Sequence, residues 1–277
     1  MDMLVVVKGA GDLATGVAHR LYRCGMRVVM TEIPQPTVVR RSVSFAEAVY
    51  ETAHVVEGVT ARLARNIDQA AEVLQRGEIP VLVDPQTREA LRLRPSVLVD
   101  AVMAKKNTGT QITDAPLVIG LGPGFTAGLD VHAVIETNRG HHLGRVIENG
   151  CAQPNTGIPG PVQGYTLERL VRAPVDGVFQ ACVEINRFVQ AGELLGYVGD
   201  QPVRAGIAGL LRGLIREGTQ VRRGLKIGDI DPRGEPEHGY TISDKARAVA
   251  GGVLEAVFYY RKQCCSTVDA YSKANES

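Results

Sequence analysis

The sequence predicts an α/β protein in three parts: a doubly wound domain, a small β domain and a C-terminal helix. Three observations support this prediction. The first third of the 277-residue chain alternates short runs of Val, Ile and Leu with helical stretches, which is the pattern of a parallel sheet with crossover helices. Two similar glycine-punctuated segments follow, and the C-terminal part has a helical apolar period.

The doubly wound domain is expected over residues 1–165. Its predicted strands are Leu4–Val7, Arg27–Thr31, Ile79–Val83, Val97–Val99 and Leu117–Leu121, and its predicted helices are Asp12–Cys24 and Asn66–Arg76. The last three strands end in Asp or Gly, which is typical of buried strands that lead into site-forming loops. The segment Gly122–Gly164 predicts functional loops, with short apolar runs at Val131–Ile135 and Arg145–Ile147.

A small β domain is expected over residues 166–233, because Val171–Val198 aligns without a gap on Val203–Ile230 at a period of 32 residues. Seven of the 28 aligned positions are identical, three of them glycines. Each copy has short strands separated by glycine turns. Two interlocked copies would therefore close one small barrel and bury edges that a single copy leaves open.

This repeat resembles the biotinyl/lipoyl-type barrel-sandwich fold, in which two quasi-symmetric halves meet at a hairpin that carries the modified lysine. The junction here reads Gly199-Asp200-Gln201-Pro202. Because it contains no lysine, we expect neither biotin nor lipoate on this chain. An ordinary pair of β-meanders is the alternative.

The C-terminal part, residues 234–277, is expected to hold a helix over Ile242–Gln263 that Ser243 caps. An apolar stripe at helical spacing predicts packing against the body, and its members are Ala246, Val249, Ala250, Val253, Leu254, Val257 and Phe258. The tail from Cys264 to Ser277 is polar and aperiodic, which predicts a mobile segment.

Composition argues against several classes of protein. The chain has 31 Lys and Arg against 30 Asp and Glu, and this balance gives no bias towards nucleic acid or anionic membranes. No apolar run reaches the about 18 residues of a membrane helix, and Leu4–Val7 is too short for a signal peptide, so we expect a cytoplasmic protein. The five cysteines form no CxxC pair, which predicts reduced thiols and disfavours structural zinc.

A glycine-rich turn joins the first strand to the first helix, with Gly9, Gly11 and Ala14 in a Gly-x-Gly-x-x-Ala pattern. Gly9 permits the tight turn, Gly11 lets the backbone approach a pyrophosphate, and Ala14 allows close packing of helix on strand. Glu32 ends the second strand, where a carboxylate would accept hydrogen bonds from ribose hydroxyls. These residues predict a Rossmann-like nucleotide site, although Asp12 would repel phosphate. A purely structural turn is the alternative.

Polar residues also follow two later strands. Asp84 and Asp100 each come directly after a predicted strand, and Lys105, Lys106 and Asn107 follow Asp100. Residues just past the strand ends converge on the crevice of such a sheet, so this group would position a charged substrate or Mg²⁺. The alternative is that the lysines are solvated and the aspartates cap turns.

A second glycine-rich loop holds Gly122 and Gly124, whose amides would bind an anion. Acid, base and metal-ligand side chains follow within 13 residues, namely Asp130, His132, Glu136, Arg139, His141 and His142. We expect Glu136 and His141 to transfer protons, because His titrates near neutrality and a carboxylate can orient it. Their spacing matches no zinc template such as HExxH, and satisfied histidines at a polar strand end are the alternative.

These observations give two sets of predicted site residues, with no metal assigned. The predicted catalytic set is Lys105, Asn107, Glu136, Arg139 and His141, and the predicted cofactor-binding set is Gly9, Gly11, Asp12, Glu32, Gly122 and Gly124. Cys151 lies beside them, and its thiolate would carry sulfur or selenium if a cation lowered its pKa. An inert buried cysteine is the alternative.

Several stretches resemble the YqeB-type accessory family of the selenium-dependent molybdenum hydroxylase system, from the first strand to about residue 258. They include GAGDLATG, EIPQPTVVRRSVSFAEAVY, VDAVMAKKNTGT, LGPGFTAGLDVHAVIETNRGHHLGRVI, PNTGIPGPVQGYTLERLVRAP, GLKIGDIDPR and ISDKARAVAGGVLEAV. Carried over by position, the motif residues are the two predicted sets together with Arg40, Arg41, Asp100, Lys106, Asp130, Asn155, Asp231 and Arg233.

The resemblance implies a bacterial maturation factor for molybdenum hydroxylases of the xanthine or purine dehydrogenase type. Its partners would be that hydroxylase and the other maturation proteins. The bound cofactor would be a nucleotide such as NAD or molybdopterin cytosine dinucleotide, which is bridged by pyrophosphate. An NAD-dependent oxidoreductase and a non-catalytic scaffold that binds the hydroxylase are the alternatives, and a homo-oligomer is left open.

Overall fold

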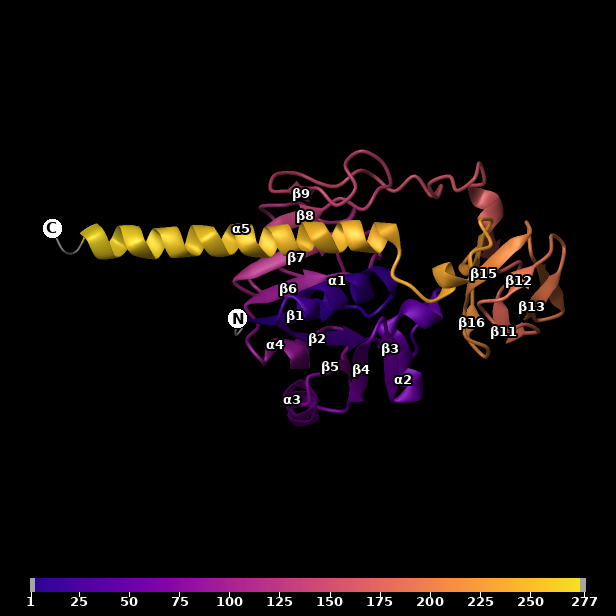
Figure 1. Ribbon diagram of the computed structural model, residues 1–277, viewed down its shortest axis with the longest axis horizontal. Coiled ribbons are helices and arrows are strands. Elements are labelled where there is room, and N and C mark those ends of the chain that lie inside the picture. The colour runs from indigo at the N-terminus through magenta and orange to yellow at the C-terminus, as the bar shows by residue number, and fades with distance from the viewer. Residues whose placement is uncertain (1–2, 275–277) are drawn as a thin grey trace.

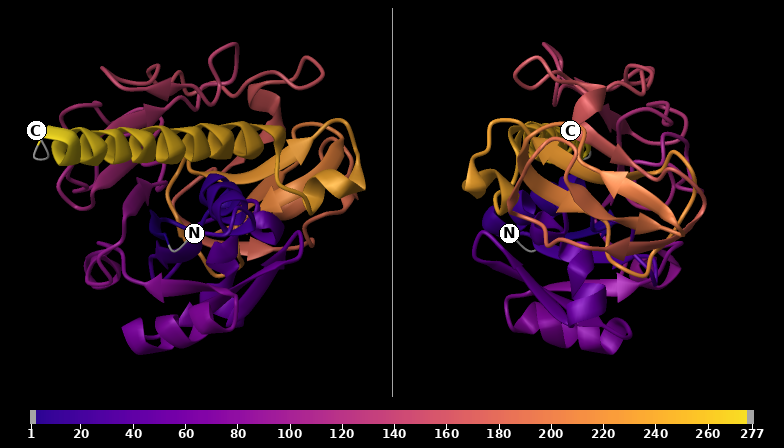
Figure 2. Two further views of the ribbon diagram at one scale, coloured as in Figure 1. Left: turned by 60° about the vertical axis from the view of Figure 1, so that its left-hand side comes forward. Right: turned by 90° about the vertical axis from the view of Figure 1, so that its right-hand side faces the viewer.

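The computed structural model describes residues 3–274, with side chains to residue 262. A large sheet forms the body, a small β domain lies at one end, and a long C-terminal helix crosses the sheet and projects from the opposite end (Figure 1). The segment that connects the large sheet to the β domain runs along the surface of the molecule before it enters the β domain (Figure 2).

The large sheet has nine strands in the order β3-β4-β5-β2-β1-β6-β7-β8-β9. Their bounds are β1 Leu4–Lys8, β2 Arg27–Glu32, β3 Ala53–Val56, β4 Val59–Ala64, β5 Ile79–Val83, β6 Val97–Asp100, β7 Leu117–Leu121, β8 Ala133–Ile135 and β9 Val146–Ile147. The seven strands from β4 to β8 are parallel, and the edge strands β3 and β9 are antiparallel to their neighbours. The parallel strands therefore direct their carboxyl ends to one edge of the sheet.

Helices and loops cover both faces of this sheet. Val5 and Val7 of β1 pack in one apolar cluster with α1 (Asp12–Arg23) and α5 (Asp244–Ala274). Val6 points the other way, into a cluster that includes residues of α3 (Ile67–Gln75) and α4 (Arg88–Leu91). Successive side chains of a strand alternate between faces, so an all-apolar strand such as β1 requires cover on both sides.

The β3–β4 hairpin is an element that the sequence pattern did not predict. Its two-residue turn consists of Glu57 and Gly58, both with positive φ, at 44° and 79°. Positive φ at both central residues suits the twist of a tight hairpin, and glycine adopts it without strain. The hairpin extends the sheet because β4 pairs in parallel with β5, and β3 then pairs antiparallel with β4 at the edge.

Side chains cap the starts of α3 and α5, and the cap of α5 is the predicted Ser243. The Asn66 side chain accepts a hydrogen bond from Gln69 N at 2.9 Å at the start of α3. The Ser243 Oγ accepts one from Ala246 N at 3.1 Å at the start of α5. The predicted end of α5 was wrong, because the helix continues past Gln263 to Ala274; residues 275–277 lie outside the described part of the chain. Phe258 was also assigned wrongly to the packed stripe, since it is 44% exposed.

The β domain contains two four-stranded sheets, β10-β17-β15-β12 and β14-β13-β11-β16. Its strands are β10 Leu170–Arg172, β11 Gly177–Ala181, β12 Phe188–Val189, β13 Leu194–Val198, β14 Gln201–Arg204, β15 Gly209–Leu214, β16 Gln220–Val221 and β17 Lys226–Asp231. The 32-residue period relates them in order, β10 to β14, β11 to β15, β12 to β16 and β13 to β17. Each sheet takes two strands from each copy, so the copies are interlocked as the repeat predicted.

Glycines occupy repeat positions where strands approach most closely. A Cβ on Gly196 would overlap the carbonyl oxygen of Gln180, and a Cβ on Gly228 would lie 2.9 Å from the Cβ of Val171. Because Gly196 and Gly228 are equivalent in the two copies, the same packing constraint explains both. The shared glycines of the repeat therefore reflect close strand contacts in each half.

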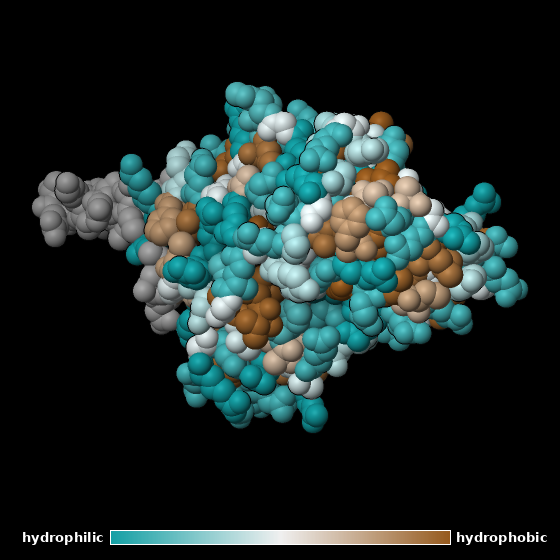
Figure 3. Space-filling view, turned by 45° about the vertical axis from the view of Figure 1, so that its right-hand side comes forward, coloured by the Kyte–Doolittle hydropathy of each residue, from teal (hydrophilic) through white to brown (hydrophobic). Residues whose placement is uncertain are grey.

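Within residues 3–274, no helix combines the length and the apolar character needed to cross a membrane. On the face shown in Figure 3, hydrophilic side chains cover most of the surface, and apolar ones form small patches between them.

Candidate functional site

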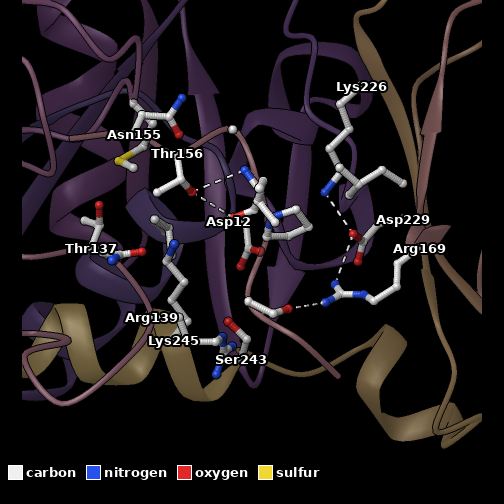
Figure 4. Close-up of a pocket in the computed structure, with 18 of the residues that line it drawn as sticks. Asp12, Thr137, Arg139, Asn155, Thr156, Arg169, Lys226, Asp229, Ser243 and Lys245 are labelled. Carbon is white, nitrogen blue, oxygen red and sulfur yellow. Dashed lines mark hydrogen bonds and ion pairs between the residues drawn. The ribbon is translucent and has the colours of Figure 1, made fainter. Parts of the chain in front are cut away.

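A cavity of about 470 Å³ lies where the carboxyl edge of the sheet, the start of α5 and the β domain meet (Figure 4). The sheet side contributes the start of α1 and the loops after β6, β7 and β8. The segment 153–162 crosses from the sheet to the β domain and forms another wall. Parallel strands of an open sheet build their sites at this edge, so the location agrees with the predicted crevice.

Positive charge dominates this cavity. Its lining includes three carboxylates, Asp12, Asp229 and Asp244, against nine cationic side chains, Arg40, Lys105, Arg139, Arg169, Arg172, Arg212, Lys226, Arg233 and Lys245. Such an excess stands out in a chain whose overall charge is +1. Like charges confined to one cavity repel each other, and a bound anion would relieve that repulsion.

The β-domain side of the cavity is built on one buried carboxylate, Asp229, which is 1% exposed. It accepts hydrogen bonds from Lys226 at 2.9 Å and from Arg212, and it also contacts Arg169 at 3.4 Å. Burial raises the pKa of Asp229, but the three cations outweigh burial and hold that pKa below its usual range. Asp229 thus fixes three cationic side chains at the cavity wall, of which Figure 4 labels Lys226 and Arg169.

The opposite wall carries a second ion pair. Arg139 donates two hydrogen bonds to Asp244, at 2.6 and 2.8 Å. The hydrogen bonds from Arg139 hold the pKa of Asp244 well below its usual range. This pair joins the loop after β8 to the first residue of α5.

Two lysines that line the cavity have no hydrogen-bond or ion-pair partner among the described residues, Lys105 after β6 and Lys245 in the first turn of α5. Lys245 is half-buried, and burial lowers its pKa. Lys105 is exposed and has φ of +62°, a conformation that L-residues rarely adopt. Strained backbone of this kind concentrates at functional sites.

The predicted glycine turn reaches the cavity at Asp12 and Leu13. Gly9 has φ of +95° and lies against the backbone of Ala101, whereas Gly11 has ordinary φ of −71° and precedes α1. The carboxylate of Asp12 pairs with Arg40 at 3.0 Å. The repulsion that Asp12 would exert on a phosphate is therefore offset by a guanidinium.

Glu32 contacts the glycine turn itself. Its carboxylate accepts hydrogen bonds from Ala10 N at 2.9 Å and from Ile33 N at 2.8 Å. Burial raises the pKa of Glu32. Glu32 does not line the cavity, and its observed role is to hold the turn in place.

Three residues of the predicted catalytic set lie outside the cavity lining. Asn107 bonds within its own loop, accepting from Gly109 N and Thr110 N. Glu136 is 2% exposed and accepts hydrogen bonds from Asn138 N at 2.6 Å and Gln153 N at 2.8 Å. These two side chains shape loops that line the cavity.

His141, the third of these residues, is exposed, and its ring contacts that of His142 at 5.0 Å. The structure brings Lys105 and Arg139 to the cavity but leaves His141 outside it.

The second glycine loop packs against the neighbouring loops. A Cβ on Gly122 would overlap the Thr137 hydroxyl, and a Cβ on Gly124 would lie 2.6 Å from Lys106 N. Both glycines also have positive φ, of 73° and 112°. They allow the loops after β6, β7 and β8 to lie close together at the cavity.

The two aspartates considered as Mg²⁺ ligands have other partners. Asp84 accepts hydrogen bonds from three backbone amides at the start of α4. Asp100 is 1% exposed and pairs with Lys8 at 3.1 Å. Among the described residues, no group of three or more His, Cys, Asp or Glu side chains is arranged to hold a metal ion.

Cys151 is exposed rather than buried, and its Sγ lies 3.3 Å from the hydroxyl of Thr126. It does not line the cavity.

Sequence reasoning missed the cationic network of the β domain, although the repeat contained a signal for it. The charged residues Arg212, Lys226, Asp229 and Asp231 stand where the first copy has Gln180, Leu194, Tyr197 and Gly199. Both copies form the same strands, so the fold alone does not require this charge. These four charges distinguish the second copy from the first, and Arg212, Lys226 and Asp229 line the cavity.

Comparison with solved structures gives only weak similarity. An aspartoacylase family protein from Mesorhizobium loti matches at a TM-score of 0.27 and 10% identity, over 83% of this chain and 84% of that one. The ectoine utilization protein EutE (DoeB) from Ruegeria pomeroyi matches at a TM-score of 0.26 and 12% identity, over 83% of this chain and 85% of that one. Superpositions of this quality do not identify a shared fold.

No family model matches the chain. A much stronger similarity is to the uncharacterized protein YqeB of Escherichia coli (strain K12), which is 51% identical over 260 residues. The match includes 94% of this chain but 48% of that protein, so the chain spans about half the length of its relative. This chain is therefore a relative of YqeB along nearly all of its own length.

Proposed function

We propose that this protein binds a pyrophosphate-bridged nucleotide in the cationic cavity. The observation that carries the proposal is the lining itself, in which nine Lys and Arg side chains face three carboxylates. The cavity volume of about 470 Å³ falls within the range of about 300–1,000 Å³ that is usual for small-molecule sites. A dinucleotide carries its negative charge on its bridging phosphates, which matches such a lining.

The glycine turn supports the same ligand class. No side chain caps the start of α1, so its first amides are available to an anion. Arg40 compensates the charge of Asp12 beside these amides. The strand order around β1, with β2 and β5 on one side and β6 and β7 on the other, supports a Rossmann-like arrangement in which this turn lies at the switch point.

We further propose that the protein acts in the maturation of a selenium-dependent molybdenum hydroxylase. The motif resemblance supplies this pathway, and molybdopterin cytosine dinucleotide is then the leading ligand because it is pyrophosphate-bridged. NAD is the alternative ligand and would make the chain an oxidoreductase. The matched region spans about half of YqeB. Any activity that requires the whole length of YqeB is therefore also only proposed for this chain.

The β domain is proposed to be a barrel-sandwich domain over residues 166–233, between an α/β domain and the C-terminal helix. Its support is the 32-residue symmetry of the two interlocked sheets. The β13–β14 hairpin, Gly199–Pro202, has no lysine that could carry biotin or lipoate. We therefore propose a different role for this domain, which is to supply cavity residues and to contact the hydroxylase.

Thermal shift with a nucleotide panel tests the ligand class. The panel contains NAD(H), NADP(H), ADP-ribose, CTP and inorganic pyrophosphate, each with and without Mg²⁺. Bound ligand stabilises by RT ln(1 + [L]/Kd), so a ligand at a hundred times its Kd adds about 2.7 kcal/mol. We expect pyrophosphate-bridged ligands to give the largest shifts, and a flat panel would refute nucleotide binding.

The pathway has its own test in host cells. Lys105→Ala should lower selenium-dependent hydroxylase activity while leaving the protein folded, and His141→Ala should leave that activity intact because His141 lies outside the cavity. Full activity with Lys105→Ala would contradict the proposed role of the cavity in maturation.

A further inference from the structure

We propose that Lys245 is the proton-linked contact of this cavity: it binds the ligand phosphate and takes up a proton as the ligand enters. The inference rests on the proposed function and deepens it, because it names the residue that makes binding depend on pH.

The first step is the position of Lys245. Its side chain lines the cavity beside Arg139, across from Lys226 and Asp229 (Figure 4). No described residue accepts a hydrogen bond from its amine. The carboxylate next to it in sequence, Asp244, is occupied by the two hydrogen bonds from Arg139.

The second step is the electrostatic surroundings of that amine. Arg139 from the loop after β8 and Lys226 from β17 disfavour its positive charge. Asp12 from α1 and Glu136 from the end of β8 favour it, but Asp12 is paired with Arg40 and Glu136 with two backbone amides. The first turn of α5 also disfavours a cation, because the helix dipole is positive there.

These surroundings explain the depressed pKa. Burial is the largest cause, and Arg139 adds to it, so the pKa of Lys245 lies below its ordinary value. A phosphate in the cavity would act in the opposite direction, because a nearby anion favours the ammonium form. Between the pKa of the free state and that of the bound state, binding therefore draws one proton from solvent, and affinity rises as the pH falls.

Isothermal titration calorimetry with ADP-ribose measures this uptake. Its two diester phosphates keep a fixed charge near neutral pH, so any proton exchanged belongs to the protein. Titrations at one pH in Hepes and in Tris, which differ in ionisation enthalpy, give the number of protons from the difference in observed heat. We expect the wild type to take up protons on binding. The number of protons should increase as the pH approaches and passes the pKa of Lys245 in the ligand-free protein.

Two variants and a control assign the proton. Lys245→Arg keeps a permanent charge, so it should bind ADP-ribose within about threefold of wild type but take up no proton. Lys245→Met should weaken binding about tenfold or more and also abolish uptake. Lys262→Met changes an exposed lysine of the same helix outside the cavity, and it should behave as wild type. Uptake that persists in Lys245→Arg would overturn the inference.

A labelling experiment separates failure of this inference from failure of the proposed function. Pyridoxal 5′-phosphate is an anionic aldehyde that condenses with a neutral amine to an imine and releases water; borohydride then reduces the imine to a stable amine. As the pH is raised in steps, peptide mass spectrometry should find Lys245 labelled ahead of Lys106 and Lys262, because burial and Arg139 lower the pKa of Lys245. Binding of ADP-ribose without proton uptake would overturn the inference alone. Absence of both binding and preferential labelling would overturn the inference together with the proposed function.

Discussion

Three buried polar atoms of the residues that line the cavity have no hydrogen-bond partner within the described part of the chain: Asp12 Oδ1, Arg40 Nε and Arg169 Nε. Buried polar groups are almost always paired, with protein or with ordered water. Two of these atoms are donors on guanidinium groups. An anion or a water molecule in the cavity could accept hydrogen bonds from these two donors.

The two glycines of the first turn should respond differently to substitution. Gly11 has negative φ, and a Cβ there would lie 3.5 Å from Val38, an ordinary contact. Gly11→Ala should therefore lower the free energy of unfolding by at most about 1 kcal/mol, the cost of alanine at the N-cap of α1. Because its methyl group would keep a pyrophosphate from the backbone, ADP-ribose binding should weaken about tenfold or more.

Gly9→Ala is the matched control for stability. Its positive φ of 95° and its contact at 3.2 Å with Ala101 should cost about 1–3 kcal/mol, measured by urea unfolding. Equal destabilisation by the two variants, or wild-type ligand binding by Gly11→Ala, would contradict the role assigned to Gly11.

The position of a side chain could be predicted where the residue type and the strand end determine it. Asp12, Lys105 and Arg139 line the cavity because each belongs to a loop or helix start at the carboxyl edge. Glu136 has the same sequence context, yet backbone amides of Asn138 and Gln153 occupy its carboxylate. Such pairing depends on loop conformation, which the residue type alone does not determine.

At the scale of elements, α5 brings the N-terminal turn that holds Ser243, Asp244 and Lys245 to the cavity. The helix packs on α1 through small side chains: a Cβ on Gly16 would lie 2.8 Å from the Cβ of Ala246. Close approach of these helices requires the absence of a side chain at residue 16. The packing of α5 therefore fixes the position of Lys245.

Two adjacent glycines of α5 test this packing. Gly251→Ala should stabilise the protein by about 0.5–1 kcal/mol, because alanine favours a helix and its Cβ would meet only the Arg20 guanidinium at 3.4 Å. Gly252→Ala should destabilise it by about 1–3 kcal/mol, because its Cβ would overlap the carbonyl oxygen of Gly144. Urea unfolding measures both, and destabilisation by Gly251→Ala or stabilisation by Gly252→Ala would contradict the observed helix orientation.

The elements predicted from periodicity were the strongly patterned ones. β5 and β7 have the predicted bounds, because β5 is an apolar run between Glu78 and Asp84, and Pro116 and Gly122 delimit β7. The short β3–β4 hairpin was missed, since Ala53–Val56 and Val59–Ala64 mix polar and small residues. Their pairing depends on the turn at Glu57 and Gly58 and on the neighbouring β5 strand.

At the scale of the whole molecule, contacts between the β domain and the sheet domain preform the cavity. Arg41 Nε donates to the Leu214 carbonyl oxygen at 2.8 Å, and Asn186 donates to the Ser42 hydroxyl at 2.7 Å. Arg216 pairs with Glu47 and Glu51. The repeat predicted a β domain, but its cationic second copy faces the cavity only because of these long-range contacts.

The neighbouring residues Lys105 and Lys106 allow the most direct test of the central claim. Both are exposed lysines in one loop, but Lys105 lines the cavity and Lys106 does not. The measurement is the Kd of ADP-ribose for Lys105→Met and for Lys106→Met. Loss of a charged contact costs about 1.5–3 kcal/mol, so Lys105→Met should weaken binding about tenfold or more, while Lys106→Met should bind as wild type. Equal affinities of the two variants would contradict ligand binding in this cavity.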